Sequence, residues 1–314
     1  MTILLCGAAA LAATARGETK PDPLSDLGVY VADADANFLC FDPRLDGSAN
    51  WDWNPGKSPL SRPLIRDCDR SAVARPNAIA FTCHNVDCGL GKVLFTCDGG
   101  GFGMIDVGCG YSMHLEAFGR VEGRPVAITQ LGDTVFVLAV PDRDRITLVD
   151  CSVHPWKSEN QPKKHFVQKG ICGVDWDQPR HRLWAIGPDG LVGWEYAIWT
   201  TKDLVRREEH PLPAELGAKP RDLRLNNDGL LSFVTDRGVC SFDADTGRFA
   251  LVERREGLFA FGKSTKGNMY FTRGADGTAD FVEIGGKRVS AKGGAKLTAA
   301  AMRPVGVRDF RDRK

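Results

Sequence analysis

The sequence predicts an all-β protein built from repeated four-stranded units, and three observations support this prediction. Residues 219–252 contain four short strand-like runs separated by turn sequences. Two features of this stretch recur along the chain at intervals of roughly 40–50 residues. The first and last copies are each incomplete, and each supplies what the other lacks. This period, with four strands per repeat, is typical of a β-propeller.

The best-defined repeat can be followed strand by strand. Its expected strands are residues 220–225, 230–234, 239–242 and 248–252. The turns between them, rich in Asn, Asp and Gly, are residues 227–229, 236–238 and 243–247. Four antiparallel strands cannot bury both of their faces alone, so the unit needs neighbours stacked against it.

The first recurring feature is the start of each repeat, where a basic residue precedes Pro or Gly and then an apolar strand. The residues at this position are Arg75, Arg124, Lys169, Lys219 and Arg303, with Glu256 as the exception. The second feature is an apolar residue followed by an acid at the end of the third strand. These pairs are Phe41-Asp42, Ile105-Asp106, Val149-Asp150, Trp194-Glu195, Phe242-Asp243 and Val282-Glu283. The two series alternate along the chain, which predicts six repeats.

The two ends of the chain are expected to complete one blade together. The first acidic pair has no strand-start motif before it, and the last strand-start motif has no acidic pair after it. We therefore expect residues 303–310 to be the innermost strand of the blade formed by residues 28–53. Pairing the ends removes two exposed sheet edges. The predicted fold is a six-bladed β-propeller of four-stranded antiparallel blades, closed by the C-terminal strand joining the N-terminal blade.

Length and composition fit one propeller domain over residues 16–314. The 35 Gly and 17 Pro residues can supply the many turns, and 43% apolar residues allow a large core between blades. The net charge of +1 argues against nucleic acid or an anionic membrane as the main partner. No run after the N-terminus is long and apolar enough to span a membrane.

Residues 1–15 form an apolar run without a charge that ends in Ala13-Thr14-Ala15. This pattern predicts a cleaved signal peptide and a secreted or periplasmic protein. No Lys or Arg precedes the apolar run, so a disordered or buried N-terminal strand is the alternative.

Five cysteines lie close together in the chain: Cys68, Cys83, Cys88, Cys97 and Cys109. In an exported protein, Cys83 and Cys88 could form a small disulfide loop, or either could pair with Cys109. Free thiols, or a zinc site that also uses His84, are the alternatives. No second pair of ligands stands at metal spacing, so we predict no metal and no cofactor. We expect the other cysteines of the mature chain to be small buried hydrophobes: Cys40, Cys151, Cys172 and Cys240.

The tryptophans fall into two groups. Trp51 and Trp53 share one face of an expected strand, where they either pack an outer strand onto the next blade or form a stacking platform for a sugar ring. Trp176, Trp184 and Trp194 fall at strand positions and are expected in the core.

Several short motifs carry a family resemblance. Trp176-Asp177 with residues 181–187, then Asp222-Leu223 and residues 238–247, together with Trp51 to Trp53, resemble exported bacterial six-bladed propellers classed as a domain of unknown function. The resemblance covers most of residues 28–310, and it implies the fold but no activity. Strand starts in that family often carry His, whereas this chain has Arg-Pro or Lys-Pro there, so no His-based metal site is implied.

The innermost strands of a propeller line its central tunnel, and their starting ends gather at one mouth. We therefore expect five cations to ring that mouth: Arg75, Arg124, Lys169, Lys219 and Arg303. Asn77 and Asp222 would contribute polar groups from inner strands. Converging cations in a concave funnel attract anions. The alternative is that the cations form salt bridges between blades with acids in turns on the same face, namely Asp35, Asp98, Asp142, Asp189, Asp236 and Asp276.

The function predicted from these patterns is an exported binding module for an extracellular small molecule or glycan, such as an anionic carbohydrate. One alternative is a polysaccharide lyase or lactone hydrolase with Asp222 as the base in the tunnel, and another is a protein-interaction scaffold. A calcium-dependent lactonase would need several tunnel carboxylates. The expected inner-strand positions Ala78, Ala127, Asp222 and Gly306 offer only one.

Overall fold

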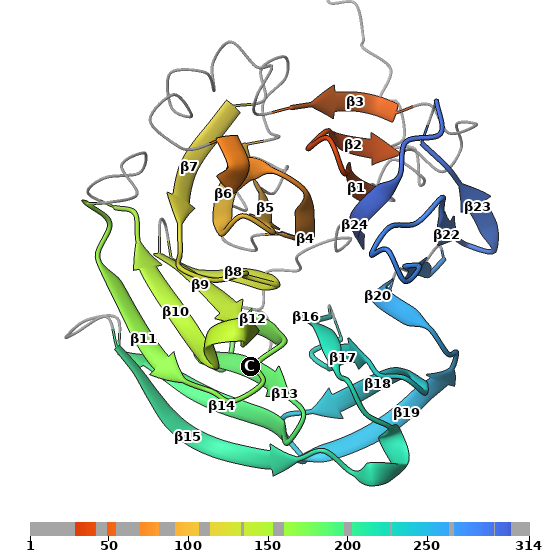
Figure 1. Ribbon diagram of the computed structural model, residues 1–314. Coiled ribbons are helices and arrows are strands. Elements are labelled where there is room, and N and C mark those ends of the chain that lie inside the picture. Colours follow the sequence, from red (N-terminus) through yellow and green to blue (C-terminus); the bar gives the residue numbers. More distant parts are fainter. Residues whose placement is uncertain are drawn as a thin grey trace, which may run out of the picture.

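A computed structural model of the 314-residue chain describes residues 29–41, 49–54, 70–81, 92–106, 114–132, 135–152, 160–197, 203–226, 228–263, 267–291 and 293–302. These residues form four-stranded antiparallel sheets arranged around a common centre (Figure 1). The prediction of a propeller with four-stranded antiparallel blades is confirmed. The expected signal peptide, residues 1–15, lies outside the described residues.

The described residues form six such sheets, whose strands follow one another from the centre of the ring outward. The first consists of β24 (Leu297–Met302), β1 (Val29–Asp33), β2 (Phe38–Phe41) and β3 (Ala49–Trp53). The second consists of β4 (Pro76–Phe81), β5 (Lys92–Cys97), β6 (Gly101–Asp106) and β7 (His114–Arg120). The third consists of β8 (Ala127–Gly132), β9 (Val135–Val140), β10 (Arg145–Asp150) and β11 (Lys163–Val167).

The fourth sheet consists of β12 (Gly173–Asp177), β13 (Arg182–Gly187), β14 (Gly190–Ala197) and β15 (Asp203–Pro211). The fifth consists of β16 (Arg221–Leu225), β17 (Leu231–Val234), β18 (Gly238–Asp243) and β19 (Arg248–Arg254). The sixth consists of β20 (Leu258–Gly262), β21 (Met269–Thr272), β22 (Val282–Ile284) and β23 (Lys287–Val289). Short 3-10 turns occupy Arg70–Val73, Pro141–Arg143 and Ala214–Leu216.

The core lies between the sheets. Each pair of neighbouring sheets encloses a cluster of buried apolar side chains, for example Phe38 and Phe95 between the first and second sheets. Trp184 and Phe242 fill the space between the fourth and fifth sheets, with ring centroids 5.4 Å apart. Because each sheet buries its faces only against its neighbours, the closed ring is the cooperative unit.

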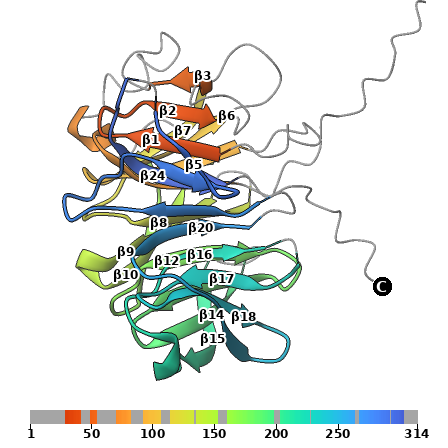
Figure 2. The ribbon, with the colours of Figure 1, turned by 90° about the vertical axis from the view of Figure 1, so that its right-hand side faces the viewer.

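The two ends of the described chain pair in one sheet, but the strand that closes the ring differs from the predicted one. β24 pairs antiparallel with β1, with Val31 opposite Ala300, and the two lie side by side in Figure 2. The expectation that Arg303 begins the closing strand is wrong, because β24 ends at Met302; residues 303–310 lie outside the described residues. β24 is buried along its whole length, so its small apolar residues show no alternation that would mark a strand.

The core predictions can be compared with side-chain burial. Trp176, Trp184 and Trp194 are buried, as predicted. Cys151 and Cys240 are buried free thiols, also as predicted, whereas Cys172 is only partly buried. β3 is an outermost strand, as expected of residues 51–53.

The remaining cysteine and aromatic predictions are tested only in part. Of the cysteines clustered in the sequence, Cys97 is a buried free thiol, and the others lie outside the described residues: Cys68, Cys83, Cys88 and Cys109. The same is true of His84 and of the side chains of Cys40, Trp51 and Trp53. Within the described ranges of the chain, no helix is long and apolar enough to cross a membrane.

Candidate functional site

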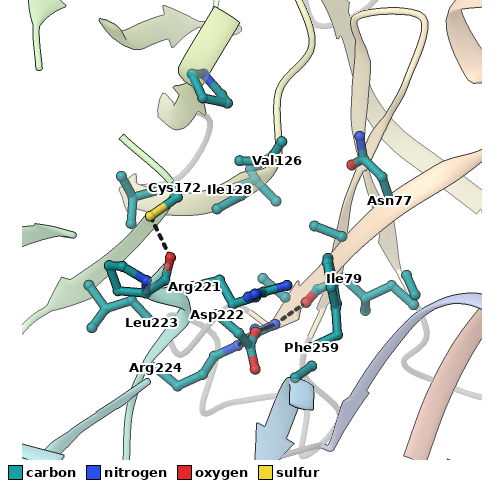
Figure 3. A pocket seen from close by; sticks show the side chains of 18 of the residues that line it. Asn77, Ile79, Val126, Ile128, Cys172, Arg221, Asp222, Leu223, Arg224 and Phe259 are labelled. Atoms are coloured by element: carbon teal, nitrogen blue, oxygen red, sulfur yellow. Dashed lines mark hydrogen bonds and ion pairs between the residues drawn. The ribbon is translucent and has the colours of Figure 1, made fainter. Parts of the chain in front are cut away.

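A cavity of about 380 Å³ occupies the centre of the ring. The innermost strands of all the sheets contribute to its wall, so it is the central tunnel of the propeller. Figure 3 shows Asn77 and Ile79 from β4 opposite Arg221, Asp222 and Arg224 from β16. The wall is mainly apolar, with cations at several points around it.

The cavity collects only some of the predicted site residues. Its lining includes four of them: Asn77, Arg124, Lys219 and Asp222. Arg75 and Lys169 do not line it. Lys169 instead lines a second cavity of about 250 Å³ beside Gln168 and His210, between the third and fourth sheets. Arg303 lies outside the described residues.

Two of the predicted cations share one aspartate as their ion-pair partner. Arg124 Nε donates to Asp98 Oδ1 at 2.7 Å, and Arg75 Nε lies 3.7 Å from Asp98 Oδ2. The guanidinium of Arg75 also donates to the backbone carbonyl of Asp276. The alternative of salt bridges between blades is therefore confirmed for Arg124, whereas Arg75 pairs with Asp98 within its own sheet. Asp142 and Asp236 have another role, since they accept from the backbone amides of Arg124 and Ala218.

Three cations of the cavity wall have no carboxylate partner. Lys219, Arg221 and Arg273 all line the cavity, and none of them forms an ion pair with a residue in the described ranges. Lys219 is exposed, whereas Arg221 and Arg273 are partly covered. The wall therefore carries more positive charge than its own acids neutralise, which favours an anion in the tunnel.

Arg273 is the most enclosed of the three. It follows β21 and lies over the Phe259 ring, with 3.4 Å from Cζ to the ring centroid. One guanidinium nitrogen donates to the backbone oxygen of Asn77 at 2.7 Å, while Nε is buried without a hydrogen-bond partner. Burial lowers the pKa of Arg273 to about 9, so the side chain is still a cation at neutral pH. A buried cation without a counterion is costly unless a ligand supplies the missing charge.

Arg224 crosses the tunnel. Its Nε donates to Asp222 Oδ1 at 2.9 Å, and its Nη2 donates to the backbone oxygen of Ile79 on β4. Asp222 Oδ2 accepts from the backbone amide of Phe261 at 2.9 Å. Both carboxylate oxygens of Asp222 are therefore occupied, and this geometry gives Asp222 the role of holding Arg224 in place.

Side chains on the inner strands also join neighbouring sheets. Asn77 Nδ2 donates to the Pro125 oxygen at 2.9 Å and to Asp98. Asp175 on β12 accepts from Thr129 and from the backbone amide of Leu225, at 3.1 and 2.6 Å. Burial raises the pKa of Asp175 to about 6, although these donors oppose the shift.

The residues missed by sequence reasoning are Arg221, Arg224, Phe259 and Arg273. A β-bulge between Arg221 and Arg224, with Asp222 at a φ of 53°, changes which side chains face the tunnel. Arg273 had a visible signal: the residues just after the second strand are acidic in several repeats, as in Asp98, but basic in this one. In the part of the chain that the structure describes, no group of three His, Cys, Asp or Glu side chains could hold a metal ion.

Comparison with known proteins supports the fold. A functionally unknown protein from Desulfotomaculum acetoxidans DSM 771 is similar, with a TM-score of 0.53 and 9% identity over 90% of this chain and 83% of that one. A protein described as a "putative 6-phosphogluconolactonase" from Bacteroides uniformis ATCC 8492 also has a TM-score of 0.53, with 11% identity over 90% and 84%. At these identities the likeness concerns the fold alone. No family model and no curated protein matches the chain.

Proposed function

We propose that this protein is a six-bladed propeller that binds an anionic ligand of low molecular weight in its central tunnel. Each of the six sheets would serve as one blade, as in the exported bacterial propellers that the sequence resembles. We further propose that the protein acts outside the cytoplasm, in the secreted or periplasmic location suggested by residues 1–15.

The observation that carries the proposal is the largely enclosed guanidinium of Arg273, which forms no ion pair with any residue in the described ranges. Among the residues that the structure describes, its Nε has no hydrogen-bond partner, and Lys219 and Arg221 add two cations without an ion-pair partner to the same wall. Guanidinium groups bind carboxylate, phosphate and sulfate well because their N–H donors match the spacing of two oxygens. An anion in the tunnel would neutralise these cations.

Isothermal titration with inorganic phosphate, sulfate and uronate oligosaccharides at fixed ionic strength tests the proposal. The wild-type protein should bind at least one of these anions, with an affinity that falls as salt rises. Arg273→Gln should weaken binding about tenfold or more, because a hydrogen bond to a charged group contributes about 1.5–3 kcal/mol. The matched control is Arg254→Gln, on the exposed outer strand β19, which should bind as the wild type does. Equal affinity of Arg273→Gln and wild type would contradict the proposal.

A further inference from the structure

The tunnel wall also restricts the part of the ligand that carries no charge. Apart from the cations, most side chains facing the cavity are aliphatic or aromatic. They include Val126 and Phe259, with several alanines between them, whereas Ile128, Val174 and Leu223 line the cavity but are almost fully buried in the clusters between sheets. A ligand body that enters this space exchanges contact with water for contact with carbon.

The few neutral or acidic polar side chains of the wall are already bonded within the protein. Asn77 donates to Asp98 and Pro125 and accepts from Thr96. Both carboxylate oxygens of Asp222 accept hydrogen bonds from within the protein. Cys172 Sγ lies 2.7 Å from the backbone oxygen of Pro220 and donates there.

Sugar hydroxyls would therefore find few side-chain partners. A hydroxyl buried without a partner costs about 1–3 kcal/mol. The wall thus disfavours a ligand covered with hydroxyl groups, even one that carries an acid.

The structure offers one position for the anionic group of such a ligand. The guanidinium groups of Arg221 and Arg273 lie against the same ring, with Cζ 5.5 and 3.4 Å from the Phe259 centroid. An acidic head group bound there would pair with these two guanidinium groups. Its apolar body would then lie against the aliphatic wall.

From this arrangement we infer that the ligand is an amphiphilic anion, with one carboxylate or phosphate head at Arg221 and Arg273 and an alkyl or aryl body in the tunnel. This inference rests on the proposed function and narrows it, because it disfavours an anionic carbohydrate. The cavity volume of about 380 Å³ is near the lower end for small-molecule sites, so a short body fits better than a long lipid.

Calorimetric titration with two ligand series tests the inference. One series is inorganic phosphate, glucose 6-phosphate and alkyl phosphates of increasing length, and the other is acetate, glucuronate and longer alkanoates. Each added CH₂ should tighten binding about fourfold until the cavity is full, since burying one CH₂ contributes about 0.8 kcal/mol. The phosphate and carboxylate series together identify the preferred head group.

A matched pair of variants tests the wall. Val126→Thr keeps the side-chain size but adds a hydroxyl, so it should reduce the gain in affinity per CH₂. Val252→Thr on β19, where Val252 is 61% exposed, should change neither that gain nor inorganic phosphate binding. If both Val→Thr variants bind the alkyl series as the wild type does, the inference is overturned.

The ligand series separates failure of the inference from failure of the proposed function. If anions bind but affinity is independent of chain length, or if glucose 6-phosphate or glucuronate binds as tightly as its alkyl counterpart, only the inference is overturned. If no anion of either series binds, both the inference and the proposed function are overturned.

Discussion

Arg224 on β16 donates a hydrogen bond across the central tunnel to the backbone oxygen of Ile79 on β4. The two strands belong to the fifth and second sheets, on opposite sides of the ring (Figure 1). The ion pair with Asp222 fixes the guanidinium in this position. One side chain thus ties the two halves of the ring together and limits how far a ligand can penetrate.

Replacing Arg224 with Met should destabilise the protein and lengthen the apolar tunnel. The change leaves the largely buried carboxylate of Asp222 without its cation, at a cost of about 2–3 kcal/mol, measurable by urea unfolding. In titrations with alkyl phosphates, affinity for the variant should continue to rise up to a longer chain length than it does for the wild type. Arg224→Lys keeps the charge beside Asp222 and should lose less stability. An unchanged chain-length optimum in Arg224→Met would show that Arg224 does not limit the tunnel.

Replacing Arg273 with Leu should raise stability while abolishing anion binding. The substitution removes a buried charge that has no counterion, which outweighs the lost contacts with Phe259 and Asn77. We expect a gain of about 1–2 kcal/mol at pH 7 without ligand. The folded-state pKa of Arg273 lies below its unfolded value, so the penalty is complete below pH 9 and lessens as pH rises above it. Urea unfolding at pH 7 and pH 10 should therefore show a smaller difference between variant and wild type at pH 10. A less stable variant at pH 7 would contradict this account.

Asp98→Asn should strengthen anion binding. The aspartate pairs with both Arg124 and Arg75 and offsets one of their two positive charges, so its removal increases the positive charge that attracts an anion. For an assumed separation of about 8 Å and an effective dielectric of 20–80, removing one charge changes the binding free energy by about 0.5–2 kcal/mol, so affinity for phosphate should rise roughly twofold to thirtyfold. The control Asp203→Asn removes an acid that pairs with Lys164 on an outer strand, and should leave phosphate affinity unchanged. Weaker phosphate binding by Asp98→Asn would argue against an electrostatic site at this mouth.

Asp175 should make stability fall as pH rises from about 4 to 6. Its folded-state pKa of about 6 lies above the unfolded value, so the folded protein binds more protons in this range. The penalty is absent below pH 4 and complete above pH 6, with a size on the order of 2–3 kcal/mol. In urea unfolding across this pH range, the free energy of unfolding of Asp175→Asn should not show this decrease. Parallel pH profiles for Asp175→Asn and wild type would show that Asp175 titrates normally.

Arg180→Ala should loosen the contact between the fourth and fifth sheets. Arg180 binds the fully buried Asp177 at 2.8 Å and reaches Asp245 with two further bonds of 2.8 Å. Its loss leaves the charge of Asp177 buried and unpaired, which should cost about 3–5 kcal/mol. The control Arg143→Ala, which breaks an exposed pair with Glu122, should cost less than about 1 kcal/mol. Adding Asp177→Asn to Arg180→Ala should restore part of the loss, and a failure to do so would point to lost packing instead.

The strands were predictable where turns and alternation both mark them. Residues 219–252 form β16 to β19 within one or two residues of expectation, because Gly238 and Gly247 sit at turns with positive φ values of 146° and 68°. β24 was not predictable in this way. Its run of small buried residues carries no polar face and resembles a linker.

The site was predictable only in outline. The repeated basic residue at the strand start predicted cations at the mouth, and Arg124 and Lys219 line the cavity. Arg221 was missed because the bulge at Asp222 breaks the two-residue period on which strand faces are assigned, so that both Arg221 and Asp222 line the cavity. Whether a cation has an ion-pair partner depends on distances between residues of different repeats, such as that from Asp98 to Arg124. The spacing of residues within one repeat gives no information on those distances.

The pairing of β1 with β24 also constrains how the molecule is made. During synthesis β1 leaves the ribosome among the first strands, yet its inner neighbour is translated after every other sheet. Until β24 has been synthesised, the sheets form an open arc in which one edge of β1 has no partner. A strand of another chain could pair with that edge incorrectly. A circular permutant that begins at β24 would join these partners by a short hairpin, and it should assemble sooner and aggregate less.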